Sequence, residues 1–248
     1  MKTDTRADLK IIGDSSSSGG HYNSAKVIGD CIVNGNLDCV RFKCVGNSKI
    51  NGDVETKEAK IIGSTSITGF LKSDNIRVTG NVDVNGDINS KDIVIRGGVD
   101  TKGGIKSDEI RIKGYVTIKK NCEAEIFRSE GPLAIGGLLN AESIEIRIHS
   151  ICKITEIGGE RIDVRRGHGS KLERIFKSIF LPADFYGGKL VTDCIEGDQV
   201  RLEYTKAKVV RGKNVVIGDG CEIDLVEYAE ECRINGHSAV KQKKNVRK

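Results

Sequence analysis

The chain has 248 residues, of which 4% are aromatic and 30% are charged, and it contains two prolines and no tryptophan. So few aromatic side chains argue against a helical bundle or a broad enzyme core, and no apolar run approaches the length of a membrane span. The formal net charge of +5 equals the charge of the last eight residues alone. The remainder of the chain is therefore near neutral, which argues against a nucleic-acid-binding face along it.

The N-terminal segment, residues 1–12, begins with the mostly polar stretch Met1–Lys10, which lacks the apolar core of a secretory signal. Gly13 and Gly19 follow it, and this pair recurs sixteen positions later as Gly29 and Gly35. Ser15–Ser18 and the adjoining Gly19 and Gly20 predict a loose corner. We expect this region to form a first turn that is one residue out of step with the turns that follow.

Glycine then recurs at every seventeenth position, at Gly29, Gly46, Gly63, Gly80, Gly97, Gly114 and Gly131. A second glycine lies six positions after each of these in every repeat but one, which has Lys120 instead: Gly35, Gly52, Gly69, Gly86, Gly103 and Gly137. A fixed period of this kind is typical of a solenoid, in which one structural unit stacks on copies of itself. Glycine suits the corners because a tight bend often requires a positive φ.

Each repeat contains three pairs of mostly apolar or small residues, and the two members of a pair are two positions apart. One repeat shows the pattern with Ile88 and Ser90, Ile93 and Ile95, and Val99 and Thr101. A spacing of two is the alternation of a β-strand, and the gaps between pairs are corners. We therefore predict an all-β fold over residues 13–165, a parallel β-helix (β-solenoid) with about 17 residues per roughly triangular coil.

Five of the eight cysteines occupy inward positions of the repeat: Cys31, Cys39, Cys44, Cys122 and Cys152. We predict buried thiols rather than a zinc site, no cofactor and no metal, because no convergent set of ligands is present. Free core thiols suit a reducing cytoplasm. The four histidines, His21, His149, His168 and His237, lie too far apart and too far out of register for a catalytic or metal centre.

Residues 166–190 leave the pattern and predict one short helical insert. Its apolar face consists of Leu172, Ile175, Phe176, Ile179 and Phe180, and basic side chains accompany it at Lys171, Arg174 and Lys177. Ser170 suits an N-cap, and Pro182 suits a helix stop. Two interpretations stay open, a helix packed on the solenoid or a helix that binds a membrane or a partner.

Strand alternation resumes in residues 191–240, for which we predict two to three further coils. The expected inward pairs are Val200 and Leu202, Ala207 and Val209, Val215 and Ile217, and Ile223 and Leu225. Residues 241–248 form a basic tail with Lys241, Lys243, Lys244, Arg247 and Lys248. We expect this tail to be a solvated, disordered end, with weak contact to anionic lipid as the alternative.

These repeats resemble the bactofilins, which are bacterial polymer-forming cytoskeletal proteins. The likeness rests on paired-glycine coils such as 80–89 throughout residues 13–165, and on the C-terminal stretches 195–212 and 216–228. The chain is most similar to the longer members of the Gram-positive type. The resemblance implies a right-handed β-helix that polymerises end to end without nucleotide into non-polar filaments. It also implies a scaffold at the inner membrane face that positions cell-envelope, cell-shape or motility machinery.

We therefore expect a non-enzymatic, cytoplasmic scaffold that is peripheral at the inner face of the cell membrane. Its expected partners are further copies of itself, a second bactofilin, the membrane or membrane-associated clients, and we expect no binding to nucleic acid. An open β-helix has unpaired backbone groups at both ends. The candidate polymerisation surfaces are Ile11, Ile12 and Val27 at one end, and Ile217, Ile223, Leu225, Val226 and Tyr228 at the other.

Two alternatives come from other functional classes. One is a β-helical adaptor or division regulator that does not polymerise. The other, less favoured, is a solenoid acyltransferase, because those enzymes have an even hexapeptide period and a catalytic histidine, whereas the period here is uneven. The chain has no G-x-x-x-x-G-K-[ST] loop, so a nucleotide-driven filament is also disfavoured.

Overall fold

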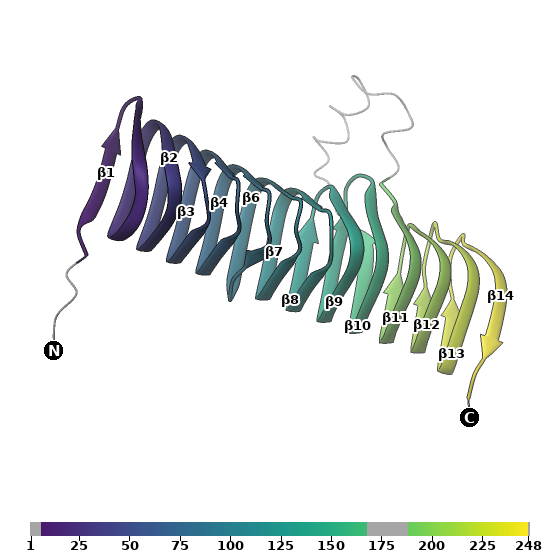
Figure 1. Cartoon of the computed structure of the whole chain (residues 1–248). Helices are drawn as coiled ribbons and strands as arrows, with labels where there is room; N and C mark the ends of the chain where they lie inside the picture. The colour runs from purple at the N-terminus through teal and green to yellow at the C-terminus, as the bar shows by residue number, and fades with distance from the viewer. Residues whose placement is uncertain (1–5, 168–187, 248) are drawn as a thin grey trace, which may run out of the picture. The chain divides into compact units, whose positions relative to one another are not determined.

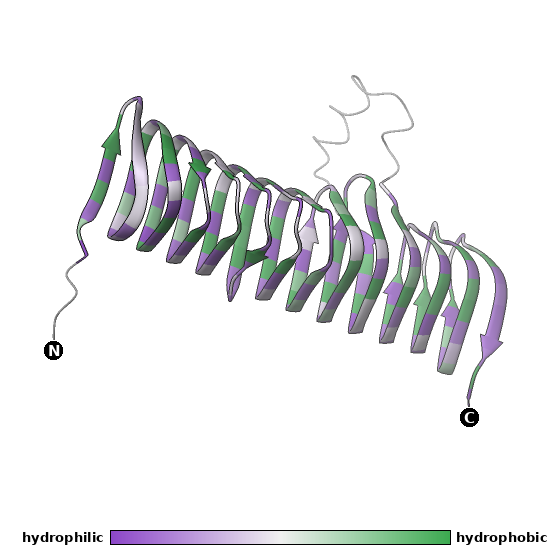
Figure 2. Ribbon diagram, in the orientation of Figure 1, coloured by the Kyte–Doolittle hydropathy of each residue, from purple (hydrophilic) through white to green (hydrophobic). Residues whose placement is uncertain are grey.

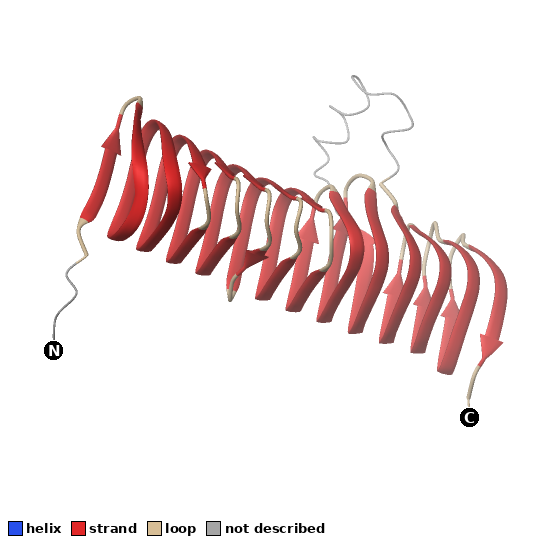
Figure 3. Ribbon diagram, viewed as in Figure 1, coloured by secondary structure: helices blue, strands red, loops and turns tan. Residues whose placement is uncertain are grey.

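The computed structural model describes residues 6–167 and 188–247 (Figure 1). The chain divides into two compact units, Met1–Lys120 and Asn121–Lys248. The regular structure of these residues is all β-strand, which confirms the predicted fold class (Figure 3). They include no helix that could cross a membrane. The predicted helical face and its basic neighbours in residues 170–181 lie outside the described part of the chain.

Unit 1, Met1–Lys120, is a parallel β-solenoid in which each strand pairs with the strand one repeat later. Its strands are β1 (Asp8–Ile12), β2 (Ser15–Asn51), β3 (Val54–Ile67), β4 (Leu71–Val84), β5 (Ile88–Asn89), β6 (Asp92–Thr101) and β7 (Ile105–Ile118). The partners are seventeen positions apart in the sequence, as in Val54 with Leu71 and Ile93 with Ile110. In β1 the offset is sixteen, as in Asp8 with Ser24, so the shorter first turn is confirmed. The solenoid thus begins at Asp8, inside the predicted N-terminal segment.

The interior of each coil contains the three predicted pairs of side chains. In β3 these are Val54 and Thr56, Ala59 and Ile61, and Thr65 and Ile67, all of them buried. Apolar and polar residues consequently alternate along the strands (Figure 2). The five cysteines predicted to be inward are buried, and all eight cysteines are free thiols. The buried hydroxyls of unit 1 are paired, as in Ser48 with Thr65 at 2.9 Å, which removes the cost of enclosing them. In unit 2 the buried Ser129 hydroxyl has no partner among the described residues.

The two glycine columns are required for different reasons. Gly80 has a φ of +133°, and a Cβ on it would lie 2.0 Å from the carbonyl oxygen of Gly63 in the preceding coil. Only glycine meets both conditions. The second column departs from our expectation, because Gly52, Gly69, Gly86 and Gly103 do not have a positive φ. A Cβ on Gly86 would instead lie 2.8 Å from the Gly69 oxygen, so close stacking excludes a side chain there.

Unit 2, Asn121–Lys248, is also a parallel β-solenoid, but its coils vary in length. Its strands are β8 (Cys122–Glu130), β9 (Leu133–Ile148), β10 (Cys152–Arg166), β11 (Leu190–Leu202), β12 (Thr205–Ile217), β13 (Glu222–Ile234) and β14 (Ala239–Asn245). Partners are eighteen positions apart for Ile144 with Ile162, and fifteen apart for Ile195 with Val210. Val164 pairs with Leu202, so the chain returns to the same repeat position after residues 168–187.

Two expectations for unit 2 are wrong. Val210 and Val226 occupy the inward positions predicted for Val209 and Leu225, because the shorter coils have one residue fewer at that corner. The basic tail is not a disordered end either. Lys241, Lys243 and Lys244 lie in β14, which pairs with β13 from Glu222 with Ala239 to Tyr228 with Asn245.

Candidate functional site

The N-terminal end of the solenoid is formed by β1. Ile11 and Val27 are buried, whereas Ile12 is 63% exposed. β1 pairs with β2 along one edge, and no other strand in the described ranges pairs with its second edge. The N–H of Gly13 donates to Ile28, and the N–H of Asn23 donates to Ala7. Because these groups alternate along a strand, the N–H groups of Asp8, Lys10 and Ile12 face the unpaired edge.

The C-terminal end differs from the predicted surface. Ile217, Ile223 and Val226 are buried, and β14 covers Ile223, Leu225, Val226 and Tyr228 through backbone pairing. Among the described residues, the unpaired edges at this end belong to β14 itself and to the last part of β13, residues 230–234. Ile234 is 41% exposed there. The sequence does not predict this further strand, because three lysines in a short segment are typical of a solvated tail.

Lys243 ends one of the core columns at this end. It pairs with Val226, which is fully buried, and so continues the column of buried apolar side chains that contains Val210 and Ile195. The ammonium donates to the carbonyl oxygen of Cys232 at 3.2 Å and lies 5.0 Å from the centre of the Tyr228 ring. An inward charge on an edge strand opposes indiscriminate strand addition.

The unpaired strands at the two ends occupy the same position in the repeat, which we call a phase match. Ile11 in β1 and Ile234 in β13 have the same position in the repeat, as the strand registers and the glycine period show. β14 covers two of the three faces of the last coil and leaves the third, residues 230–234, unpaired. β1 is a strand of that third face. The next strand needed to continue the coil after β13 and β14 is therefore one equivalent to β1, placed beside residues 230–234.

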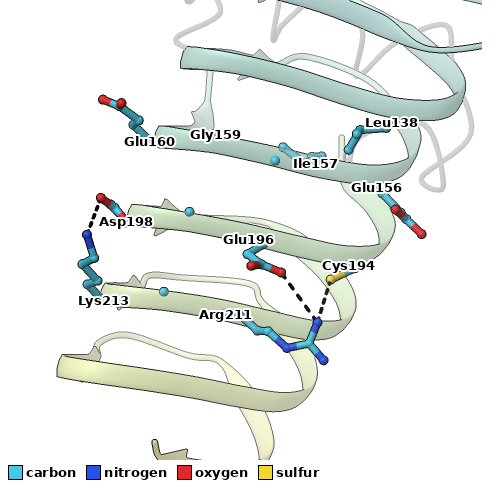
Figure 4. A pocket seen from close by; sticks show the side chains of 13 residues that line it. Leu138, Glu156, Ile157, Gly159, Glu160, Cys194, Glu196, Asp198, Arg211 and Lys213 are labelled. Carbon is cyan, nitrogen blue, oxygen red and sulfur yellow. Dashed lines mark hydrogen bonds and ion pairs between the residues drawn. The ribbon is translucent and has the colours of Figure 1, made fainter. Parts of the chain in front are cut away.

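A groove of about 540 Å³ lies on unit 2, across β10, β11 and β12 (Figure 4). Its floor is a column of glycines, in which Gly159 pairs with Gly197 and Gly197 with Gly212. One rim carries Asp198 and Lys213, whose side chains are 2.7 Å apart. A Cβ on Gly197 would lie 2.5 Å from the Gly159 oxygen, so the hollow follows from close stacking of the coils.

The second rim of this groove contains Cys194 and Arg211. A guanidinium nitrogen of Arg211 lies 3.7 Å from the Cys194 sulfur and 3.8 Å from a Glu196 oxygen, and its Nε donates to Glu227 at 2.8 Å. Partial burial raises the pKa of the Cys194 thiol, against the opposing effect of Arg211. The thiol is therefore protonated at neutral pH and is a weak nucleophile. The two basic side chains of the groove, Arg211 and Lys213, are already paired with carboxylates of the protein, so the groove does not define an anionic ligand.

The histidines lie in separate surface pairs. His21 is 2.8 Å from Asp38, and His149 is 3.2 Å from Glu130. His237 lies in the turn before β14, and His168 is outside the described ranges. The part of the chain that the structure describes contains no group of three or more His, Cys, Asp or Glu side chains placed to hold a metal ion.

The chain is similar to two proteins of Bacillus subtilis (strain 168). It is 42% identical over 111 residues to uncharacterized protein YhbF, covering 43% of this chain and 41% of the relative. It is 36% identical over 98 residues to uncharacterized protein YhbE, covering 38% of this chain and 37% of the relative. The chain thus spans well under two thirds of the length of these relatives. No protein-family model matches it, and no solved structure matches it.

Proposed function

We propose that this protein is a non-enzymatic scaffold that assembles end to end into filaments without nucleotide. The observation that carries the proposal is the phase match between the unpaired face of β13 and strand β1. A second copy placed with its β1 beside residues 230–234 continues the backbone pairing and the core columns. Such a joint uses two different surfaces, so it does not close and it repeats along a filament.

The side chains at the joint support this arrangement. In the register that continues the winding, Leu9 and Ile11 of one copy stack on Cys232 and Ile234 of the next. His21 pairs with Asp38, seventeen positions later, so its neighbour Gly20 lies one coil before the buried Leu37. The same register therefore places Gly20 over Lys243. The missing side chain at Gly20 leaves room for the inward lysine. A joint between two C-terminal ends would instead bring two sets of β14 lysines together.

This joint gives the filament a direction, unlike the non-polar filaments that the resemblance implies. It also places Asp8 beside Glu231 and Lys10 beside Arg233 of the next copy. Since these are like charges, added salt should favour assembly by screening them. As a scaffold, the filament would present many copies of one surface to envelope, cell-shape or motility machinery at the inner face of the membrane.

Sedimentation and negative-stain microscopy at micromolar concentrations, without nucleotide, test the proposal. Lys10→Pro and Ile234→Pro each remove an N–H from one unpaired edge while leaving the ladder behind it intact. Each variant alone should remain monomeric, because it keeps only one competent end. An equimolar mixture should form dimers and stop there, because the competent end of one variant fits that of the other.

Other outcomes separate the alternatives. If the joints are between like ends, each variant alone forms dimers and the mixture adds nothing. If the wild-type protein stays monomeric at every concentration and salt condition, the scaffold proposal is wrong. The non-polymerising adaptor would then be the better interpretation, since Lys243 and the serines of the first turn make both ends partly polar.

A further inference from the structure

One outward face of unit 1 carries two columns of side chains from seven successive coils. The first column contains Lys10, Lys26, Lys43, Lys60, Arg77, Val94 and Arg111, and the second contains Ile12, Ile28, Val45, Ile62, Thr79, Arg96 and Lys113. The strand registers pair Lys10 with Lys26, Lys43 with Lys60 and Lys60 with Arg77. We call these 14 positions the basic face. They contain eight basic residues and no acidic or aromatic one.

Stacked basic residues at this spacing repel one another. Neighbouring strands are about 4.8 Å apart, and like charges directly opposite on paired strands are destabilising. Lys26, Lys43, Lys60 and Arg96 have no acidic partner among the described residues to offset this repulsion. Arg77 and Arg111 contact carboxylates at the edge of the face, Glu58 at 3.9 Å and Asp92 at 2.6 Å. The arrangement costs stability in the free protein, and an anionic partner would reverse that cost.

The basic face is hollowed along part of its length. A groove of about 620 Å³ is lined by Lys60, Arg77 and Arg111 of the first column and by Arg96 and Lys113 of the second. Ile62, Thr79 and Val94 line the same groove. Long flexible cations around an apolar floor can lie along a surface with their stems on it and their charges directed outward.

Aliphatic side chains accompany the lysines in the first coils. Ile12 is 63% exposed and Ile62 is 37% exposed, and the partly exposed Ile28 and Val45 lie between them in the same column. Each of these coils therefore presents one lysine and one aliphatic side chain to solvent. A pattern of basic and aliphatic residues on one face is typical of surfaces that bind at the boundary of anionic lipid.

We propose that the basic face binds the surface of an anionic lipid bilayer. The eight cations supply attraction to negative headgroups, and the aliphatic column enters the boundary between headgroups and acyl chains. A single-stranded nucleic acid fits less well, because the face has no aromatic side chain for base stacking and would leave the isoleucines unused. The inference deepens the proposed scaffold by giving it a membrane-facing side, but it concerns the single chain and does not require filaments.

Vesicle flotation tests the inference, because filaments alone sediment but do not float. The wild-type protein should float with vesicles that contain phosphatidylglycerol and not with phosphatidylcholine vesicles. Lys43→Glu, Lys60→Glu and Arg96→Glu together should lower the partition coefficient roughly a hundredfold. The matched control, Lys49→Glu, Lys102→Glu and Lys119→Glu, changes the net charge equally at exposed positions outside the face. It should lower partition no more than about threefold, because those charges are more distant from the membrane.

The aliphatic column has its own test. Ile12→Ser with Ile62→Ser should weaken flotation about fivefold even at high salt, whereas Ile32→Ser, at a 45% exposed position outside the face, should not. Equal loss in the two charge-reversal variants would overturn the proposal, as would wild-type flotation that ignores lipid charge. Binding to an RNA or DNA oligonucleotide without vesicle binding would assign the face to nucleic acid. Sedimentation without vesicles reports assembly separately, so failure of the scaffold and failure of the basic face are distinguishable.

Discussion

Unit 1 and unit 2 use the same repeat positions for different charge patterns. The outward positions that form the basic face of unit 1 are occupied in the next coils by Arg128, Glu130, Glu145, Arg147, Asp163 and Arg165, three of each sign. These pair with one another, as in Arg147 with Glu145 at 2.6 Å and Arg165 with Asp163 at 2.6 Å. In unit 1 the corresponding columns contain no carboxylate.

This difference teaches that a solenoid determines its inward residues strictly and leaves its outward ones free. The coil requires only that the core columns continue and that glycine occupy the tight corners. Alternating charges at outward positions stabilise the stack modestly, as in unit 2. A column of one sign costs stability and concentrates potential on one face, as in unit 1. The same outward position can therefore either stabilise the stack, when neighbouring coils have opposite charges, or contribute to a charged surface, when they have the same charge.

The largest effect should come from the interior, which is built in the same way in both units. Ile110→Asp in unit 1 and Ile195→Asp in unit 2 each bury an unpaired charge, and each should cost about 4 kcal/mol or more. Asp83→Lys, at an exposed outward position with no ion pair inside the described ranges, should change stability by less than about 0.5 kcal/mol. Urea unfolding followed by circular dichroism measures all three. Comparable damage from Asp83→Lys would mean that inward and outward positions are wrongly assigned.

A glycine pair should give the next largest difference. Gly80→Ala in unit 1 places a Cβ where φ is +133° and the Gly63 oxygen is 2.0 Å away, so the backbone must shift. We expect a loss of about 2–4 kcal/mol. Gly158→Ala in unit 2 meets nothing closer than 3.4 Å and should cost less than about 1 kcal/mol. Equal losses in thermal unfolding would show that stacking of the glycine column is not the constraint.

Exchanging the two charge patterns should have a smaller effect of opposite sign in the two units. Lys60→Glu introduces a carboxylate between Lys43 and Arg77 and should stabilise unit 1 by about 0.5–1 kcal/mol. Glu145→Lys removes a carboxylate that contacts both Arg128 and Arg147, and it should destabilise unit 2 by about 1 kcal/mol. Both effects should shrink in about 0.5 M salt because salt screens exposed charges. A loss of stability from Lys60→Glu at low salt would contradict the claim that the basic face is strained.

The interior was predictable because its periodicity is strict. Spacings of two within a pair and seventeen between coils place Val54, Ile61 and Ile67 inward from the sequence alone, and all three are buried. The prediction failed where coils change length. The shorter coil of unit 2 moves the inward position from Val209 to Val210, and a single sequence gives no signal for the missing corner residue.

The surfaces were harder to predict because they depend on sums across coils. The net charge of the solenoid is near zero, and this sum concealed the separation of charge between its surfaces. A basic column was nevertheless visible in the sequence, because a basic residue recurs every seventeen positions at Lys43, Lys60 and Arg77. In sequence, Lys241–Lys244 favours a solvated tail because short lysine-rich segments have low strand propensity. Pairing with β13 overrides that preference, since the preceding strand supplies a ready edge.

The smallest expected effect is in acid and applies to both units. Asp38 in unit 1 accepts hydrogen bonds from His21 and Arg6, in that order of influence, and these lower its pKa. Glu222 in unit 2 has its pKa lowered by Lys189 and, to a lesser degree, Lys206. A carboxylate with a lowered folded pKa stabilises above its unfolded pKa, near about 4, and loses that contribution as pH falls through the folded value. Since both carboxylates are well exposed, Asp38→Asn and Glu222→Gln should each cost only about 0.5 kcal/mol at pH 7. The cost should fade below about pH 4.

The control variant is Lys60→Gln, in the basic face that lacks carboxylates, and it should instead stabilise the protein at pH 7 and at pH 3. Urea unfolding of the three variants at both pH values measures this, and a cost for Asp38→Asn or Glu222→Gln that persists undiminished at pH 3 would show that these pairs do not carry the acid dependence.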